Sequence, residues 1–184
     1  PRDEQFAFWI NLYNAVTVRV VAEHYPVASI RDITLGGGIV ASLMGGPWKA
    51  MTTAVSGIAF SLDDIEHTIL RGIFKDPRLH YAINCGSVGC PNLRTEPFRG
   101  ATLERDLDAA AREFLNSQRG VAIEGGKLVL SGILKWYRRD FGGDERAVLA
   151  HVARYAEGER AEAIARGLAV ARYDYDWSLN GADR

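Results

Sequence analysis

Apolar residues recur at helical spacing in several stretches of the chain, which indicates helices that bury one face. The first stretch covers residues 3–24 and ends before Pro26. Asn14 falls inside its apolar arc and Asn11 lies near the edge of that arc, so both amides need hydrogen-bond partners. The predicted buried arc consists of Phe6, Trp9, Ile10, Tyr13, Val16, Val20 and Val21.

Capping residues predict where further helices begin. Ser61, with Asp64 three residues later, comes close to a capping box for a second helix. The predicted buried face of this helix is Leu62, Ile65, Ile69, Leu70 and Ile73. Other predicted helices cover residues 102–116, 131–137 and 144–155, and a short one starts at Pro91.

Glu66 projects from the middle of the apolar face of that second helix, and His67 lies at its edge. Neighbours along an α-helix do not face each other, so one of the two is expected to serve a site and the other to be structural. Glu66 is alternatively a buried partner for Arg71 or Arg78, because a buried carboxylate needs compensation.

Short alternating apolar runs beside turn-forming residues predict strands and hairpins. The predicted strands are residues 48–55 and 58–60, turned at Ser56-Gly57; residues 121–123 and 128–130, turned at Gly125-Gly126; and residues 79–84 and 169–175. Residues 30–48 are rich in glycine and predict a loop. The mixture predicts an α+β fold in one domain spanning 1–184, with helices on a small, mainly antiparallel sheet, and a papain- or transglutaminase-like form is one version of it.

Composition narrows the classes of function. The 184 residues carry 22 basic and 23 acidic side chains, a formal net charge of −1, which argues against nucleic-acid binding. No apolar run reaches the ~20 residues of a transmembrane helix. The first residues already belong to a predicted helix, so we expect a truncated N-terminus. We expect the protein to be exported to the periplasm if a signal peptide was removed, and otherwise to be cytoplasmic.

Cys90 is the sharpest candidate for chemistry. Pro91 suits the first position of a helix, which would place Cys90 at the cap, where unpaired N–H groups lower the pKa of a thiol. Gly86 and Gly89 would allow the close backbone approach of an oxyanion site. The alternative is that Cys90 is a small buried apolar residue. Cys85 is a weaker candidate nucleophile. It could instead be a thiol in the core or form a disulfide with Cys90.

A nucleophilic thiol needs a base and a group that orients the base. His67 and His80 are the candidate bases, because they lie nearest to the cysteines and the acid in sequence. Glu66, Asn14 or Asn11 could orient the chosen histidine.

His80, Cys85 and Cys90 also form an evenly spaced trio that, with His67, could bind zinc. Structural zinc sites usually place their cysteines closer together, so we expect no metal and no other cofactor.

Long motifs resemble the domain of unknown function 547 family, and the chain looks like a bacterial-type member. They are FWINLYNAV (8–16), YPVASIRDI (25–33), FSLDDIEHTILRG (60–72), DPRLHYAINCGSVGCPNLR (76–94), LDAAAREFLN (107–116), LKWYRRDFGG (134–143) and YDYDWSLN (173–180). Plant members often carry a serine-proline where this chain has Cys90-Pro91. The resemblance implies that the residues within its motifs matter, without saying which chemistry they perform; among them are Asn14, Glu66, His67, Arg78, His80, Cys85, Ser87, Cys90 and Pro91.

These observations lead to one expected function and two alternatives. We expect a thiol-dependent hydrolase or transferase with papain-like chemistry, in which Cys90 attacks a peptide, amide or small-thiol substrate. His67 or His80 would be the base, and Glu66 or Asn14 the orienting group. The alternatives are a non-catalytic module that binds a peptide or small molecule, and a structural domain whose cysteines form a disulfide or bind zinc. The candidate substrate-binding residues are Cys85, Ser87, Asn11, Arg78 and Trp9.

Overall fold

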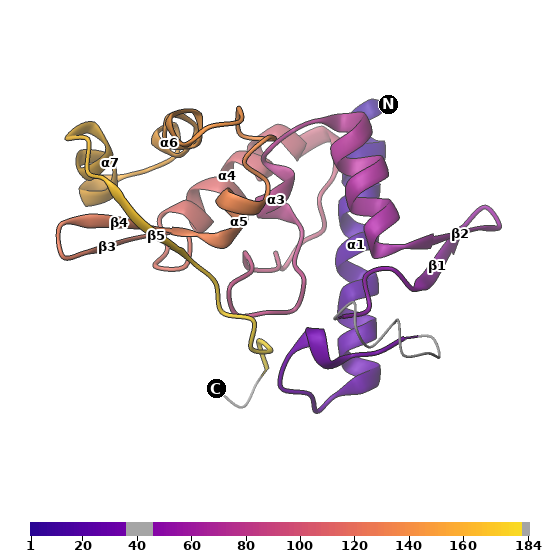
Figure 1. The fold of residues 1–184 in the computed structure, drawn as a ribbon. Coiled ribbons are helices and arrows are strands. Elements are labelled where there is room, and N and C mark those ends of the chain that lie inside the picture. Colours follow the sequence, from indigo (N-terminus) through magenta and orange to yellow (C-terminus); the bar gives the residue numbers. More distant parts are fainter. Residues whose placement is uncertain (36–45, 182–184) are drawn as a thin grey trace.

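The computed structural model describes residues 1–35 and 46–181 and shows an α+β fold built around two hydrophobic clusters. Helix α1 (Arg2–His24) and the helix η2 (Asp64–Phe74) stand side by side in the first cluster (Figure 1). Helix α4 (Leu103–Leu115) contributes its first turns to this cluster and its last turns to the second cluster, which also contains a three-stranded sheet. The predicted loop over 30–48 lies partly outside the described residues, because 36–45 are not among them.

The prediction for α1 is confirmed. The helix ends at His24, and most of its predicted apolar arc is buried, while Trp9 and Val21 are half-buried. Phe6 stacks on Phe74 of η2 with ring centroids 4.5 Å apart, which joins the two helices at one end.

The second helix begins as predicted but has a different form. Ser61 and Asp64 bond reciprocally, the Ser61 N–H to the carboxylate at 2.9 Å and the Asp64 N–H to the hydroxyl at 3.0 Å. Residues 64–74 then form a π-helix, whose wider turn rotates later residues relative to an α-helix. Ile73 is therefore 54% exposed, and its predicted burial is wrong. Long π-helices are rare, and π-bulges occur frequently at functional sites.

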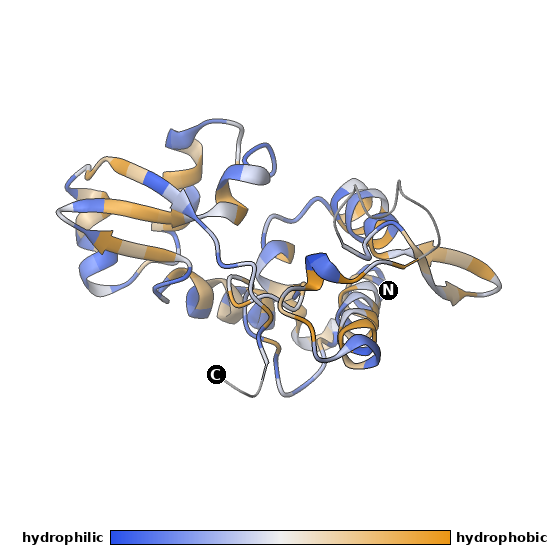
Figure 2. Cartoon of the chain, turned by 60° about the horizontal axis from the view of Figure 1, so that its bottom comes forward, coloured by the Kyte–Doolittle hydropathy of each residue, from blue (hydrophilic) through white to orange (hydrophobic). Residues whose placement is uncertain are grey.

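Two small sheets contain the strands, and both hairpins are confirmed. Strands β1 (Met51–Val55) and β2 (Ile58–Ser61) pair antiparallel, as do β3 (Val121–Glu124) and β4 (Lys127–Ser131). The last strand, β5 (Val170–Asp174), runs parallel to β4 and completes the three-stranded sheet. Apolar residues occur in both sheets (Figure 2), but those of β3 and β4 are mostly buried, whereas those of the β1–β2 hairpin are mostly exposed or half-buried.

Short helices complete the second cluster. Ser131 caps α5 (Gly132–Trp136) and Asp144 caps α6 (Glu145–Ala153), as predicted. Helix α7 (Gly158–Ala165) was not predicted, and it packs on β3, where the Arg160 guanidinium donates to the carbonyl of Val121 at 2.7 Å. Two short 3-10 turns complete the helical elements: η1 (Ile30–Asp32) follows α1, and η3 (Gly100–Thr102) leads directly into α4.

Residues 79–84 do not form the predicted strand. Leu79–Ala82 is a helical turn, α3, that begins after Asp76-Pro77. The Asp76 carboxylate accepts the N–H of Arg78 at 2.9 Å and its carbonyl accepts the N–H of Leu79 at 3.2 Å, as at a helix start. This Asp-Pro capping turn outweighs the strand propensity of the apolar run.

The helix predicted at Pro91 is also absent from the described residues. The preceding loop pairs instead with the end of the chain: the N–H of Val88 bonds to Ser178 at 2.8 Å, and that of Gly89 to Asp176 at 2.9 Å. Asn84 also binds the Pro91 carbonyl through its side-chain amide at 2.6 Å. These contacts hold the segment in turns, with the Cys90 N–H bonded back to the carbonyl of Ser87 at 3.1 Å, and no helix follows, so Cys90 is not a helix cap.

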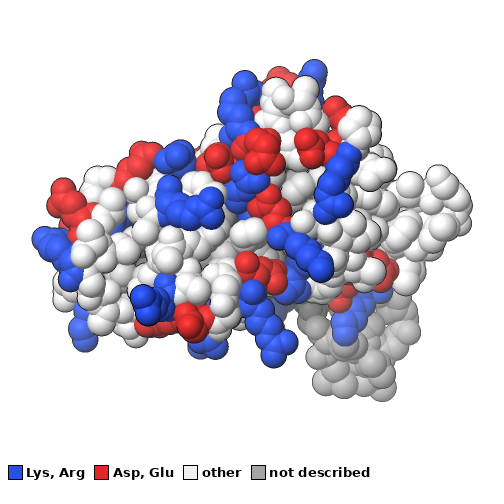
Figure 3. Space-filling view, turned by 90° about the horizontal axis from the view of Figure 1, so that it is seen from above, with Lys and Arg blue, Asp and Glu red and all other residues white. Residues whose placement is uncertain are grey.

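Two surface properties agree with the composition. On the face shown in Figure 3, basic and acidic side chains are interspersed. Within residues 1–35 and 46–181, no helix has the length and hydropathy needed to cross a bilayer.

Candidate functional site

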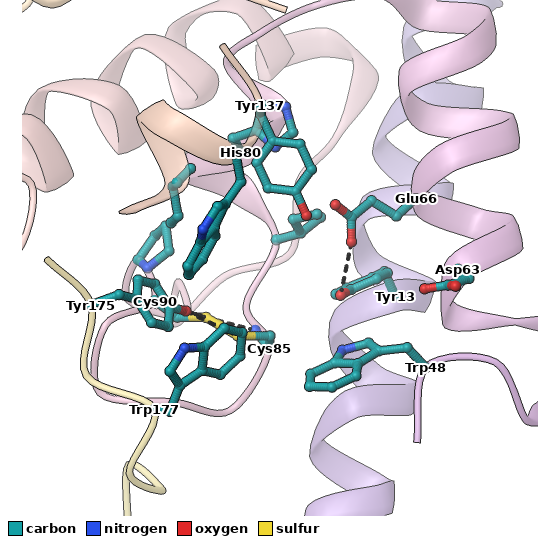
Figure 4. A pocket seen from close by; sticks show the side chains of 14 residues that line it. Tyr13, Trp48, Asp63, Glu66, His80, Cys85, Cys90, Tyr137, Tyr175 and Trp177 are labelled. Atoms are coloured by element: carbon teal, nitrogen blue, oxygen red, sulfur yellow. Dashed lines mark hydrogen bonds between the residues drawn. A yellow bond between two sulfur atoms is a disulfide. The ribbon is translucent and has the colours of Figure 1, made fainter. Parts of the chain in front are cut away.

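A cavity of about 230 Å³ lies between the two hydrophobic clusters. In Figure 4, Glu66 and Tyr13 line one side, while the cysteines, Tyr175 and Trp177 line the other. Its complete lining is Tyr13, Trp48, Asp63, Glu66, His80, Ile83, Cys85, Cys90, Pro91, Ile133, Trp136, Tyr137, Tyr175 and Trp177.

Glu66 is the most unusual side chain of this lining. It is 6% exposed, and its Oε2 accepts a hydrogen bond of 3.2 Å from the Tyr13 hydroxyl. Its buried Oε1 has no hydrogen-bond partner among the described residues. Burial raises the pKa of Tyr13 far above its usual value and the carboxylate raises it further, so this phenol stays protonated. The Tyr13 hydroxyl thus holds one carboxylate oxygen, and the Tyr137 hydroxyl also approaches the carboxylate, so burial and this carboxylate raise the pKa of Tyr137.

His80 is buried and tied to Asp140. Its Nε2 lies 2.7 Å from the Asp140 carboxylate, and its ring stacks on Tyr137 at 4.0 Å. Burial lowers the pKa of His80, which leaves a neutral imidazole at pH 7. Burial alone would raise the pKa of Asp140, but hydrogen bonds from His80 and Arg71 hold it well below its usual range. The charged carboxylate therefore orients a neutral histidine.

His67 does not line the cavity. Its Nδ1 lies 3.1 Å from a guanidinium nitrogen of Arg71, which can only donate, so Nδ1 is the acceptor. The same Nδ1 is 3.9 Å from Oε1 of Glu66, closer than the expected α-helical geometry would bring these neighbours. A nitrogen already accepting from arginine has no proton to give the carboxylate.

Cys85 and Cys90 are joined by a disulfide at the edge of the cavity. The Tyr175 hydroxyl lies 3.2 Å from the sulfur of Cys85 and 3.1 Å from that of Cys90. Ser87 lies beneath them, 2.7 Å from the Tyr175 hydroxyl. Burial raises the pKa of Tyr175 to about 12, so its hydroxyl remains a donor. Of the alternatives left open for the cysteines, the structure has the disulfide, and neither cysteine is a free thiol.

Both candidate asparagines hold backbone segments together. Asn14 donates to the carbonyl of Ala82 at 2.9 Å and accepts the N–H of Asn84 at 2.8 Å. Asn11 makes the same pair of bonds to Phe98, at 2.8 and 2.9 Å. Neither lines the cavity, and Asn14 does not contact a histidine. Asn14 nevertheless positions the strand-like segment that leads into Cys85.

Arg78 and Trp9 also lie outside the cavity lining. The Arg78 guanidinium is paired with Asp76, Glu104 and Asp108 at 2.6–2.9 Å. Trp9 packs edge-on against Phe60 with centroids 5.3 Å apart. Of the predicted residues, the structure therefore brings together Cys85, Cys90, Glu66 and His80, with Ser87 beneath the sulfurs.

The aromatic walls and Asp140 were not predicted as site residues. Tyr137 and Asp140 lie in the WYRRD segment, and Tyr175 and Trp177 in the YDYDW segment. Both segments cluster aromatic and charged residues outside a regular amphipathic pattern, which was the available indication. Tyr13 gave no such indication, because its position on α1 is that of an ordinary core residue.

The cavity holds no evident metal site. Across the described ranges, no three His, Cys, Asp or Glu side chains are grouped as metal ligands. The cysteines of the proposed zinc trio bond to each other instead.

Comparison with known proteins gives one finding. A family model described as "Protein of unknown function, DUF547" matches residues 1–115. The match includes α1, η2 and both cysteines and ends before the aromatic segments around Tyr137 and Tyr175. No curated protein and no solved structure matches the chain.

Proposed function

This chain belongs to the DUF547 family of proteins of unknown function, and we propose that its cavity is the active site of a thiol-dependent hydrolase or transferase. The observation that carries the proposal is the surroundings of Cys90, whose sulfur borders the same cavity as Glu66 and His80. The proposed substrate is a small molecule or the end of a peptide, because the cavity holds about 230 Å³.

Three polar groups surround the sulfur of Cys90, and because the Ser87 and Tyr175 hydroxyls also bond to each other, the backbone N–H and one hydroxyl can donate to it at a time. The N–H of Cys85 lies at 3.0 Å, the Tyr175 hydroxyl at 3.1 Å and the Ser87 hydroxyl at 3.5 Å. Hydrogen bonds to the charged form favour a thiolate and offset the cost of burying it. This environment replaces the helix terminus that the sequence suggested.

His80 is the proposed base. Nε2–H of His80 donates a hydrogen bond to Asp140, which leaves the lone pair of Nδ1 for proton transfer. His80 would take the proton of the Cys90 thiol, the thiolate would attack an acyl carbon to form a thioester, and the leaving group would depart with that proton from His80. Water in the hydrolase, or a second nucleophile in the transferase, would then release the acyl group and give its proton to His80.

The disulfide implies that reduction precedes catalysis. A dithiol reductant would convert the Cys85–Cys90 bond into two thiols and would itself become a disulfide. Cys85 would then be a protecting partner, and Cys90 the nucleophile.

Alkylation of the reduced protein tests this assignment. After reduction and removal of the reductant, iodoacetamide at pH 6 should modify Cys90 before Cys85, as read by peptide mass mapping. Cys85→Ser should keep Cys90 reactive without a reducing step, and Cys90→Ser is the matched control. Hydrolysis of p-nitrophenyl acetate should likewise be retained in Cys85→Ser and lost in Cys90→Ser. First modification of Cys85, or no modification of either thiol, would contradict the proposal.

Dithiol–disulfide exchange is a second candidate, supported by a specific observation. The disulfide links cysteines only five positions apart and faces the cavity, so an external thiol could reach it. Exchange needs both sulfurs, whereas acyl transfer needs one. Cys85→Ser would abolish exchange and leave acyl transfer intact, which separates the two functions.

A further inference from the structure

We infer that the cavity binds an organic cation with N–H donors, through Glu66 and the surrounding aromatic rings. The inference rests on the proposed function in one respect: it names the class of substrate for that same cavity. The charge of the lining, the free oxygen of Glu66 and the aromatic walls each point to this class.

The lining is acidic. It includes the carboxylates of Glu66 and Asp63, and no lysine or arginine lines it among residues 1–35 and 46–181. Its histidine, His80, is kept neutral because burial lowers its pKa. Of the cations around this lining, Arg71 is paired with Asp140 through two hydrogen bonds, Arg31 lies over Trp177, and Lys49 acts on Asp63. A cation entering the cavity would therefore meet a negative potential.

The free oxygen of Glu66 specifies the donor. Oε2 is occupied by the Tyr13 hydroxyl, while Oε1 is buried and has no hydrogen-bond partner among the described residues. A buried carboxylate oxygen without a partner is costly, and a ligand N–H would satisfy it. The Tyr137 hydroxyl points toward the same carboxylate (Figure 4) and competes with a ligand N–H as its second donor.

Aromatic rings form the remaining walls. Trp48 and Trp177 meet nearly at right angles, with centroids 6.1 Å apart, and Trp136 stacks on Trp177 at 5.3 Å. Trp177 already carries one cation, because the Arg31 guanidinium lies 5.1 Å from its centroid. Rings of this kind attract cations in a site shielded from water.

Binding of small probes tests the inference. n-Pentylammonium, pentylguanidinium, 1-pentanol and hexanoate are compared by titration of tryptophan fluorescence, because three of the four tryptophans line the cavity. We expect one of the two cations to bind about tenfold tighter than 1-pentanol, and hexanoate to bind least. The stronger of the two cations identifies an ammonium or a guanidinium substrate.

Variants assign the effect to Glu66. Glu66→Gln should remove the preference for the cation over 1-pentanol, while Glu23→Gln, at an exposed position of α1, should retain it. Cys90→Ala should also retain it, so failure of thiol chemistry and failure of cation binding are observed separately. Equal binding of cation and alcohol by the unmodified protein, or an unchanged preference in Glu66→Gln, would overturn the inference.

Discussion

Two groups of interior polar side chains differ in how completely they are satisfied. Away from the cavity, Asn11 and Asn14 each use both ends of the amide, and Arg78 is paired with three carboxylates. In the cavity, Glu66 leaves one buried oxygen without a partner. Polar groups that support the fold are expected to be satisfied within it, whereas a binding site keeps part of its capacity for a ligand. Thr17, Thr52 and Arg94 also leave one buried polar atom without a partner within the described ranges, so Glu66 is distinguished by having that atom in the lining of the cavity.

Asn14→Ala should give the largest loss of stability. The substitution leaves the carbonyl of Ala82 and the N–H of Asn84 without their partners in a buried segment. We expect the free energy of unfolding to fall by about 4 kcal/mol, the combined cost of two unsatisfied groups. Urea denaturation measures it, with Asn14→Asp as the control that keeps the acceptor. A loss under about 0.5 kcal/mol would show that this amide is not structural.

Elements with a local cause were predictable from the sequence. The apolar arc of α1, the turns of both hairpins and the caps Ser131 and Asp144 each lie within a few residues of the structure they specify. The failures have long-range causes. The loop before Pro91 is held by residues 176–180, and no pattern near Cys90 reveals that pairing. The wider turn of η2, which exposes Ile73, also has no local pattern that we recognise.

The candidate site was predictable only in part, for the same reason. Glu66 and the cysteines stood out because their polar or reactive character conflicted with their predicted surroundings. Tyr13 and Trp177 fit a core as well as a cavity wall, so only the tertiary structure distinguishes the two roles. Asp140 was missed because its partner His80 is 60 residues away in the chain.

Acid should destabilise the protein through its buried histidines, one outside the cavity and one inside it. Burial lowers the pKa of His151 to about 4, below the ordinary 6.5, and burial also lowers that of His80. A lowered pKa means that the stabilisation is present above pH 6.5 and is lost as the pH falls toward 4. His151→Gln should remove about 2 kcal/mol of this dependence, and His80→Gln should change it in the same direction. Urea denaturation at pH 7 and pH 4 measures this dependence. The prediction would be contradicted if the free energy of unfolding changed equally between these pH values in the unmodified protein and in both variants.

Glu66→Gln should have the smallest effect on stability. The sign of this change in the free energy of unfolding distinguishes structural polar side chains from those of the cavity most directly. The glutamine can still accept from Tyr13, and the substitution removes a buried charge whose second oxygen has no hydrogen bond. Arg71 and Arg78 do not depend on Glu66, because they pair with Asp140 and with Asp76, respectively. We therefore expect the free energy of unfolding to stay the same or to rise by up to about 1 kcal/mol, because relief from charge burial offsets any lost attraction. Chemical denaturation beside Asn14→Ala in the same buffer makes the comparison. A loss of several kcal/mol would instead assign Glu66 to the structural group, whose polar atoms are paired within the fold.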